Sequence, residues 1–294
     1  MTSVRTAGTL RLADDLELTR VGFGAMQLAG PMAWGPPEDP GKAAAVLRAV
    51  IELGINHIDT SDYYGPHTVN QLIRETLHPY PEGLHLVTKV GGSRAPDKSW
   101  PAALGRDQLV RAVHDNLERL DLPVLDLVHL RMTDTLEPDD ITEPFTVLAE
   151  LQQEGLIRHL GVSNVSAGQI AVARKIAPVL SVQNAYNVIR RGDEDVLAEC
   201  EERGSAFVPF FPVRGFKPEQ GAALAEIAGD VGVSSTRLAL AWLLQHSPVT
   251  LLIPGTSSVS HLEDNVAASE LTLDAETLRR LDALRTDARG LPWG

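Results

Sequence analysis

The chain has 294 residues, of which 44% are hydrophobic and 22% charged, proportions typical of a globular protein with a substantial core. Its formal net charge of −13 disfavours nucleic acid as a partner, because a phosphate backbone is bound by clustered lysine and arginine side chains. No apolar run is long enough to cross a bilayer, and the N-terminal residues do not resemble a secretory signal. The single cysteine, Cys200, excludes an internal disulfide, so we expect a cytoplasmic protein.

The first elements expected along the chain are two short strands. Residues 10–12 and 16–18 alternate apolar and charged side chains around Asp14 and Asp15, a turn-prone pair. We expect a hairpin here that covers the N-terminal end of the domain.

Eight apolar segments after the hairpin have the composition of β-strands. They are residues 21–24, 56–59, 84–89, 125–129, 157–162, 180–183, 206–210 and 250–253. Helical patterns lie between them, at 42–53, 106–120, 141–153, 169–176 and 193–202. Such alternation is typical of parallel strands covered by helices, and eight units fit a closed barrel. We therefore predict an α/β protein with one (β/α)8 TIM barrel domain over residues 1–294.

Two further helical patterns are expected as additions outside the eight repeats. They cover residues 235–245 and 275–285, and Ser234 and Asp274 are suitable N-caps for them.

Polar residues follow several of the predicted strands. They are Asp59, Lys89, His129, Ser163, Asn164 and Gln183. In barrels of this class the chemistry lies at the C-terminal ends of the strands, so these side chains predict a site on one rim.

Asp59, Tyr64, Lys89 and His129 together suit the reduction of a carbonyl group. The carbonyl oxygen needs a proton or a strong hydrogen bond as negative charge develops on it. A tyrosine hydroxyl is a weak acid, and a nearby ammonium lowers its pKa while a carboxylate holds that ammonium in place. A histidine can orient the carbonyl, although each of these residues alone has a structural explanation.

These motifs resemble the aldo-keto reductase family over essentially the whole chain. The matching stretches are residues 22–26, 59–64, 87–89, 126–129, 161–164, 183–187 and 253–257. The resemblance implies that Tyr64 is the general acid, that Lys89 and Asp59 tune it, and that His129 orients the carbonyl. The spacing selects Tyr64 rather than Tyr63.

The resemblance also implies a nicotinamide cofactor, although the chain lacks the glycine-rich motif of Rossmann domains. Gly24, Ala25 and Met26 would approach the cofactor at the barrel mouth. Ser163, Asn164 and Gln183 would bind the carboxamide, and Phe210 would stack on the ring. The pyrophosphate would lie along Pro212, Val213, Arg214, Gly215 and Lys217. The alternative for Arg214 and Lys217 is that they belong to a solvated loop and do not contact the cofactor.

The adenosine end of the cofactor is expected at the segment after the eighth strand. Gly255, Thr256, Ser257 and Ser258 precede a helix whose free amides can hold a phosphate, and Asp264 and Asn265 match adenine contacts. Where many relatives carry an arginine for the 2′-phosphate this chain has His261, and no lysine or arginine lies between 255 and 265. We expect NADPH, with NADH as the alternative.

The substrate pocket is expected to involve Trp34, Trp100 and Arg131. Within the family the chain is most similar to the bacterial pyridoxal reductase group, through residues 22–31, 56–62 and 252–259. This similarity implies reduction of pyridoxal to pyridoxine, with pyridoxal 5′-phosphate a poorer substrate.

Two other functions remain open at this stage. One is a regulatory barrel that binds a nicotinamide without catalysis, and the other is an aldolase forming a Schiff base through Lys89. The histidines lack metal-ligand spacing, so no metal is expected. We expect a monomer acting on a small carbonyl compound, with neither nucleic acid nor membrane as a partner.

Overall fold

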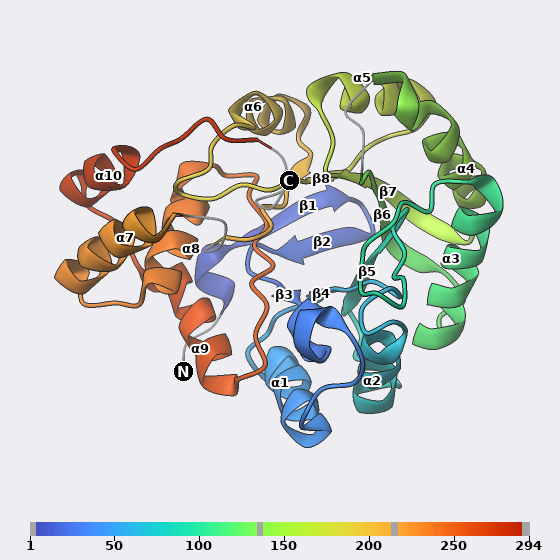
Figure 1. Ribbon diagram of the computed structural model, residues 1–294, viewed down its shortest axis with the longest axis horizontal. Coiled ribbons are helices and arrows are strands. Elements are labelled where there is room, and N and C mark those ends of the chain that lie inside the picture. The colour runs from blue at the N-terminus through green and yellow to red at the C-terminus, as the bar shows by residue number, and fades with distance from the viewer. Residues whose placement is uncertain (1–3, 134–137, 213–216, 290–294) are drawn as a thin grey trace.

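The structure is a computed structural model that describes residues 4–133, 138–212 and 217–289. Seven parallel strands form one sheet in sequence order, and helices surround it (Figure 1). The strands are β3 (Phe23–Gly24), β4 (His57–Asp59), β5 (His85–Val90), β6 (Leu125–Arg131), β7 (Ile157–Ser163), β8 (Ser181–Gln183) and β9 (Ala206–Phe207).

The sheet closes into a barrel through residues that follow β9 in the chain. Thr250 bridges Phe207, and Leu252 bridges Val21, both in parallel orientation. Backbone bonds support both junctions, at 2.9 Å from Leu251 N to Phe207 O and 2.8 Å from Gly22 N to Leu252 O. This segment occupies the position of the eighth strand in the ring, so the predicted (β/α)8 barrel is confirmed.

Ten α-helices lie in the described part of the chain. They are α1 (Pro40–Glu52), α2 (Thr68–Leu77), α3 (Arg106–Leu120), α4 (Thr142–Gln153), α5 (Ala167–Ile176), α6 (Glu194–Arg203), α7 (Pro218–Val231), α8 (Ser235–His246), α9 (Val259–Ala267) and α10 (Ala275–Asp282). Short 3-10 helices are η1 (Val4–Ala7), η2 (Ala25–Leu28), η3 (Pro31–Ala33), η4 (Pro138–Ile141) and η5 (Ala268–Glu270). None of the helices described is both long and apolar enough to span a membrane.

The extra helices are α7 and α10, which lie at the periphery in Figure 1. The sequence analysis had set α8 outside the repeats, but every residue from Leu238 to Leu244 is buried. In α7 only Leu224, Ile227 and Ala228 are buried, so α8 covers the barrel wall and α7 packs outside it. The predicted caps are present, with Ser234 accepting from Arg237 N and Asp274 from Thr277 N.

The N-terminal hairpin covers one end of the barrel, as expected. β1 (Thr9–Ala13) and β2 (Leu16–Thr19) pair in antiparallel fashion. Leu16 and Leu18 are 1% exposed and pack against side chains from the barrel interior, including Leu127. Burial of each leucine contributes about 1.5–3 kcal/mol, which favours closure at this end and leaves the opposite end for the site.

Candidate active site

A cavity of about 1380 Å³ opens at the C-terminal ends of the strands. At the barrel axis its wall includes Asp59, Tyr64, Lys89 and Arg131, and it continues to the start of α8 and to α9. Because side chains from β4, β5 and β6 meet at one end of an elongated space, the cavity can hold a small substrate beside a long cofactor.

Asp59 and Lys89 form a buried ion pair at the inner end of this cavity. Lys89 Nζ donates to Asp59 Oδ1 at 2.5 Å and to the Thr60 carbonyl at 3.0 Å. The second carboxylate oxygen of Asp59 accepts from Gln183 Nε2 at 2.9 Å. With both oxygens engaged, the carboxylate holds the ammonium in one position.

Tyr64 is buried beside this ion pair. Lys89 Nζ lies 5.2 Å from the centre of its ring. Burial raises the pKa of the Tyr64 hydroxyl, the Asp59 carboxylate raises it further, and the Arg131 guanidinium lowers it by less. Tyr64 is therefore protonated at neutral pH, in the form that a proton donor requires. The neighbouring Tyr63 also lines the cavity, and burial raises its pKa to about 12.

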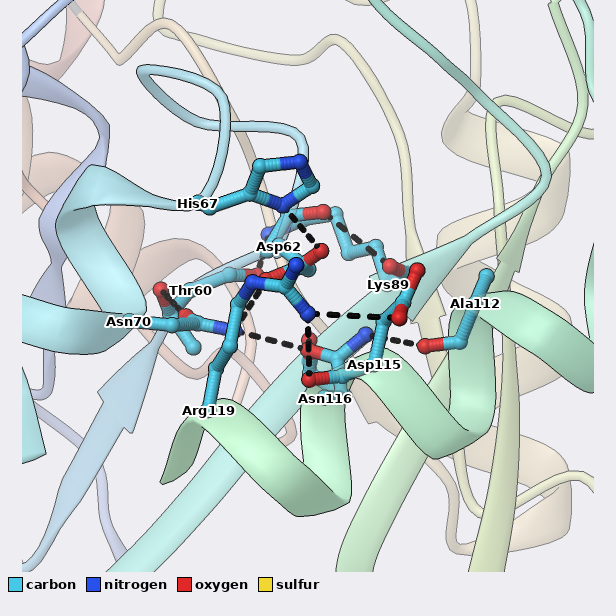
Figure 2. A network of polar contacts seen from close by, with 11 residues as sticks. Thr60, Asp62, His67, Asn70, Lys89, Ala112, Asp115, Asn116 and Arg119 are labelled. Carbon is cyan, nitrogen blue, oxygen red and sulfur yellow. Dashed lines mark hydrogen bonds and ion pairs between the residues drawn. The ribbon is translucent and has the colours of Figure 1, made fainter. Parts of the chain in front are cut away.

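A polar network fixes the loop that carries Tyr64. Thr60 Oγ1 donates to Asn70 Oδ1 at 2.8 Å, and Asn70 Nδ2 donates to Asn116 Oδ1 at 3.0 Å. Thr88 Oγ1 donates to the same Asn116 oxygen at 2.6 Å. Figure 2 shows Asn70 and Asn116 meeting between α2 and α3, behind the loop. Because these side chains are fully buried, the network ties the loop to both helices and to β5.

The structure separates His129 from the cavity, which corrects the position expected for it. The side chain is 1% exposed and packs beside Gly161, where a β-carbon would lie 2.6 Å from His129 Cδ2. Its Nε2 lies 3.0 Å from Ser181 Oγ. Burial lowers the pKa of His129 to about 3, and the charge of Lys89 adds to this effect. His129 is thus a neutral imidazole in the layer beneath the site.

Arg131 occupies the rim position expected for His129. β6 continues two residues beyond the predicted end, because Arg131 pairs with Ser163 of β7. Side chains two residues apart on a strand point to the same side, so Arg131 lies one level nearer the mouth. From the sequence, Arg131 was expected only among the substrate contacts.

Most of the predicted cofactor residues lie along the cavity. Its lining includes Gly24, Met26, Gln183, Phe210, Pro212, Gly255, Thr256, Ser257, His261, Asp264 and Asn265. Ala25, Ser163, Asn164, Lys217 and Ser258 are described but do not line it. Ser163 accepts from Arg131, and Asn164 Nδ2 donates to the Met132 carbonyl. Val213, Arg214 and Gly215 lie outside the described residues.

An arginine outside the sequence-based expectations lies next to the far end of the cavity, paired with a residue of its lining. Arg237, from the first turn of α8, places Nη2 2.7 Å from Asp264 Oδ1. Ser234 Oγ donates to the other oxygen of Asp264 at 2.5 Å. No lysine or arginine lies between residues 255 and 265, but α8 brings the Arg237 guanidinium to Asp264.

Of the two predicted substrate tryptophans, only Trp100 lines the cavity. It meets Tyr63 and Tyr64 edge to face, with ring centres 5.8 and 6.5 Å away. Trp34 lies outside the lining, beneath the Arg94 guanidinium, which also covers Trp100 at 3.7 Å. Trp34 therefore supports the loops around the mouth.

Comparison with known proteins agrees with this geometry. The model of the aldo/keto reductase family matches residues 20–286. The chain belongs to the aldo/keto reductase family. It is therefore an oxidoreductase, and the resemblance stated from its motifs is confirmed.

Individual relatives cover almost the entire chain. It is 51% identical to pyridoxine 4-dehydrogenase of Escherichia coli over 91% of this chain and 95% of that protein. A thermostable aldo-keto reductase solved with the inhibitor epalrestat superposes with a TM-score of 0.79 at 29% identity, covering 94% and 99% of the two chains. An aldo-keto reductase from Klebsiella pneumoniae in complex with NADPH gives 0.76 at 25% identity, covering 94% of each.

Proposed function

We propose that the protein interconverts pyridoxal and pyridoxine, with NADPH as the reductant for pyridoxal, and that residues 1–294 act as one barrel domain. The observation that carries this proposal is the 51% identity to a pyridoxine 4-dehydrogenase over 91% of the chain. The cavity supports it, because a buried tyrosine beside an ion pair shares the space with aromatic walls that suit a flat ring.

The shape of the cavity fits a nicotinamide cofactor. Phe210 offers an aromatic face near the catalytic end, while Thr256 and Ser257 offer hydroxyls at the other. His261, Thr256 and Ser257 line this end, and Arg237 lies next to it through its ion pair with Asp264. These groups favour a phosphorylated adenosine end, hence NADPH over NADH. When bound, the nicotinamide supplies the hydride for reduction and accepts it in the reverse direction.

The residues of the chain then divide the remaining work. Tyr64 donates its proton to the carbonyl oxygen during reduction and accepts one from the alcohol during oxidation. The Lys89–Asp59 pair, anchored by Gln183, holds the Lys89 ammonium in one position, 5.2 Å from the centre of the tyrosine ring. Arg131 stabilises the negative charge that develops on the carbonyl oxygen. It also takes the role expected of His129, which was to orient the carbonyl by hydrogen bonding.

The ion pair also argues against the aldolase alternative. A Schiff base requires a free amine, whereas Lys89 Nζ is engaged with Asp59 Oδ1 at 2.5 Å and with the Thr60 carbonyl at 3.0 Å. Borohydride should trap no covalent adduct between pyridoxal and the site lysine, as judged by the mass of the Lys89 peptide.

Steady-state kinetics test the proposed function. We expect NADPH consumption with pyridoxal at a higher kcat/KM than with benzaldehyde or pyridoxal 5′-phosphate, and a lower kcat/KM with NADH. If pyridoxal were no better than benzaldehyde, the substrate proposal would fall and a general carbonyl reductase would stand. Equal use of both cofactors would refute the NADPH preference.

A further inference from the structure

Arg131 is held rigidly at the catalytic end of the cavity. Its Nη1 donates to Ser163 Oγ at 2.9 Å, and its guanidinium carbon lies 4.6 Å from the centre of the Phe210 ring. The side chain also belongs to the cavity lining, together with Tyr64. A hydrogen bond on one side and a ring beneath leave the remaining N–H groups in a fixed orientation.

Lys89 has a carboxylate partner, whereas Arg131 has none among the described residues. The Lys89 ammonium lies 2.5 Å from Asp59, whose other oxygen is used by Gln183. Within residues 4–133, 138–212 and 217–289, Arg131 forms no ion pair with a carboxylate. Burial lowers the pKa of Arg131, which shows that its surroundings disfavour the charged form. A negative group on a ligand would offset this cost.

The walls beside Arg131 favour a flat ring over a flexible chain. Tyr63, Trp100 and Phe210 line the same cavity as Arg131. Tyr63 and Trp100 meet nearly at right angles, at 87°, and the Phe210 ring lies against the guanidinium. A ring placed so that its carbonyl oxygen reaches Tyr64 presents its neighbouring substituent to the same end of the cavity.

We propose that Arg131 binds an oxyanion on the ring carbon next to the carbonyl carbon, so that the substrates are aromatic aldehydes with an ortho hydroxyl group. The aromatic ring holds the two oxygens side by side, and the planar fork of a guanidinium suits such a pair. Pyridoxal carries its ring hydroxyl in this position. The inference rests on the proposed function and adds the chemical feature by which Arg131 selects the substrate.

Isomeric aldehydes test this without relying on pyridoxal itself. The assay measures kcat/KM with NADPH for 2-hydroxybenzaldehyde, 4-hydroxybenzaldehyde and benzaldehyde. We expect the ortho isomer to exceed the para isomer by about 10- to 100-fold, the usual worth of hydrogen bonds to a charged group. The para isomer carries the same functional groups and is the matched control. Similar values for the two isomers in the wild-type protein would overturn the inference while leaving the reductase intact.

Variants of Arg131 connect the preference to this side chain. In Arg131→Met the ortho preference should disappear. The kcat/KM for benzaldehyde should fall by a smaller factor than the kcat/KM for 2-hydroxybenzaldehyde. Arg131→Lys should retain part of the ortho preference. Thermal unfolding and NADPH binding by fluorescence test whether the variants are folded. If a variant does not fold, the ratio of the ortho to the para isomer in the wild-type protein still decides the inference. Retention of the full ortho preference by folded Arg131→Met would refute the role.

A phosphate group is the competing ligand for the same guanidinium. If Arg131 binds a substrate phosphate, pyridoxal 5′-phosphate should be preferred to pyridoxal, and Arg131→Met should abolish that preference specifically. This result would overturn the ortho-hydroxyl assignment. Absence of turnover with every aldehyde and with pyridoxine would instead contradict the proposed function, so the two failures are distinguishable.

Discussion

Two polar layers inside the barrel differ in what they can do, although the same strand contributes to both. His129 and Arg131 stand two residues apart on β6, about 7 Å along the strand, with side chains on the same side. His129 is enclosed by Gly161 and Ser181, whereas Arg131 reaches the cavity shared with Tyr64. Height along one strand therefore separates a structural side chain from one that can meet a substrate.

The layers also differ in charge. Burial lowers the pKa of both His57 and His129 to about 3, so the lower layer is neutral near pH 7. At the rim, Asp59 and Lys89 pair with each other and Asp59 also accepts from Gln183. Arg131 has no carboxylate partner among the described residues and faces the cavity. A closed layer can tolerate imidazole but not an unpaired ion.

The largest effect that tests this contrast is expected at Tyr64 in the rim. Tyr64→Phe should lower carbonyl reduction by about 10²–10⁴-fold, because only the hydroxyl can supply the proton. Cofactor binding, followed by fluorescence, should remain close to that of the wild type. Tyr63→Phe is the matched control and should cost less than about 10-fold. A large loss in the control with little in Tyr64→Phe would reverse the two roles.

A second test removes the support behind the rim. Asn116→Leu keeps the branched shape of the side chain but leaves Thr88 Oγ1 and Asn70 Nδ2 without their shared acceptor. The free energy of unfolding should fall by about 1–3 kcal/mol, measured in urea, and kcat should fall with it. Glu118→Leu, at an exposed position of the same helix, is the control. Equal effects of the two changes would show that the network does not hold the loop.

The neutral lower layer predicts acid sensitivity. The folded pKa of His57 lies far below the value of about 6.5 in an unfolded chain, so the unfolded state binds more protons between these values. Stability is fully present above pH 6.5 and should fall as pH decreases toward 3, by about 1 kcal/mol per pH unit for each such histidine.

Urea unfolding across this range, with His57→Phe, isolates the contribution. Neither ring nitrogen of His57 has a hydrogen-bond partner in the described part of the chain, so the change removes no bond. The variant should show a shallower loss of stability in acid than the wild type or the exposed His114→Asn. Parallel curves for all three would indicate that His57 is protonated in the folded protein.

The smallest effect on catalysis is expected at His129. His129→Asn can retain a hydrogen bond to Ser181, and kcat for reduction should change by less than about 5-fold while stability decreases. A loss as large as that of Tyr64→Phe in a folded protein would place His129 in the reaction and remove the distinction between the layers.

Much of the fold could be predicted because its signals are local. The apolar strands, the caps Ser234 and Asp274, and the hairpin residues each follow from a few neighbouring side chains. α2 and α7 were not predicted. The former is short and begins after His67 without a side-chain cap, although Val69, Leu72, Ile73 and Leu77 form a buried stripe that could have indicated it. The latter is rich in glycine and alanine and has only a weak apolar stripe.

The sequence by itself determined that the chain is a barrel, and that Asp59, Tyr64 and Lys89 follow strands whose ends share one rim. Only the tertiary structure decided which residue of β6 stands beside them. β6 ends where its pairing with β7 ends, at Arg131 opposite Ser163, and the register between two strands is not a property of either segment alone. The same reason explains Arg237, which α8 brings to Asp264 from 27 positions earlier in the chain.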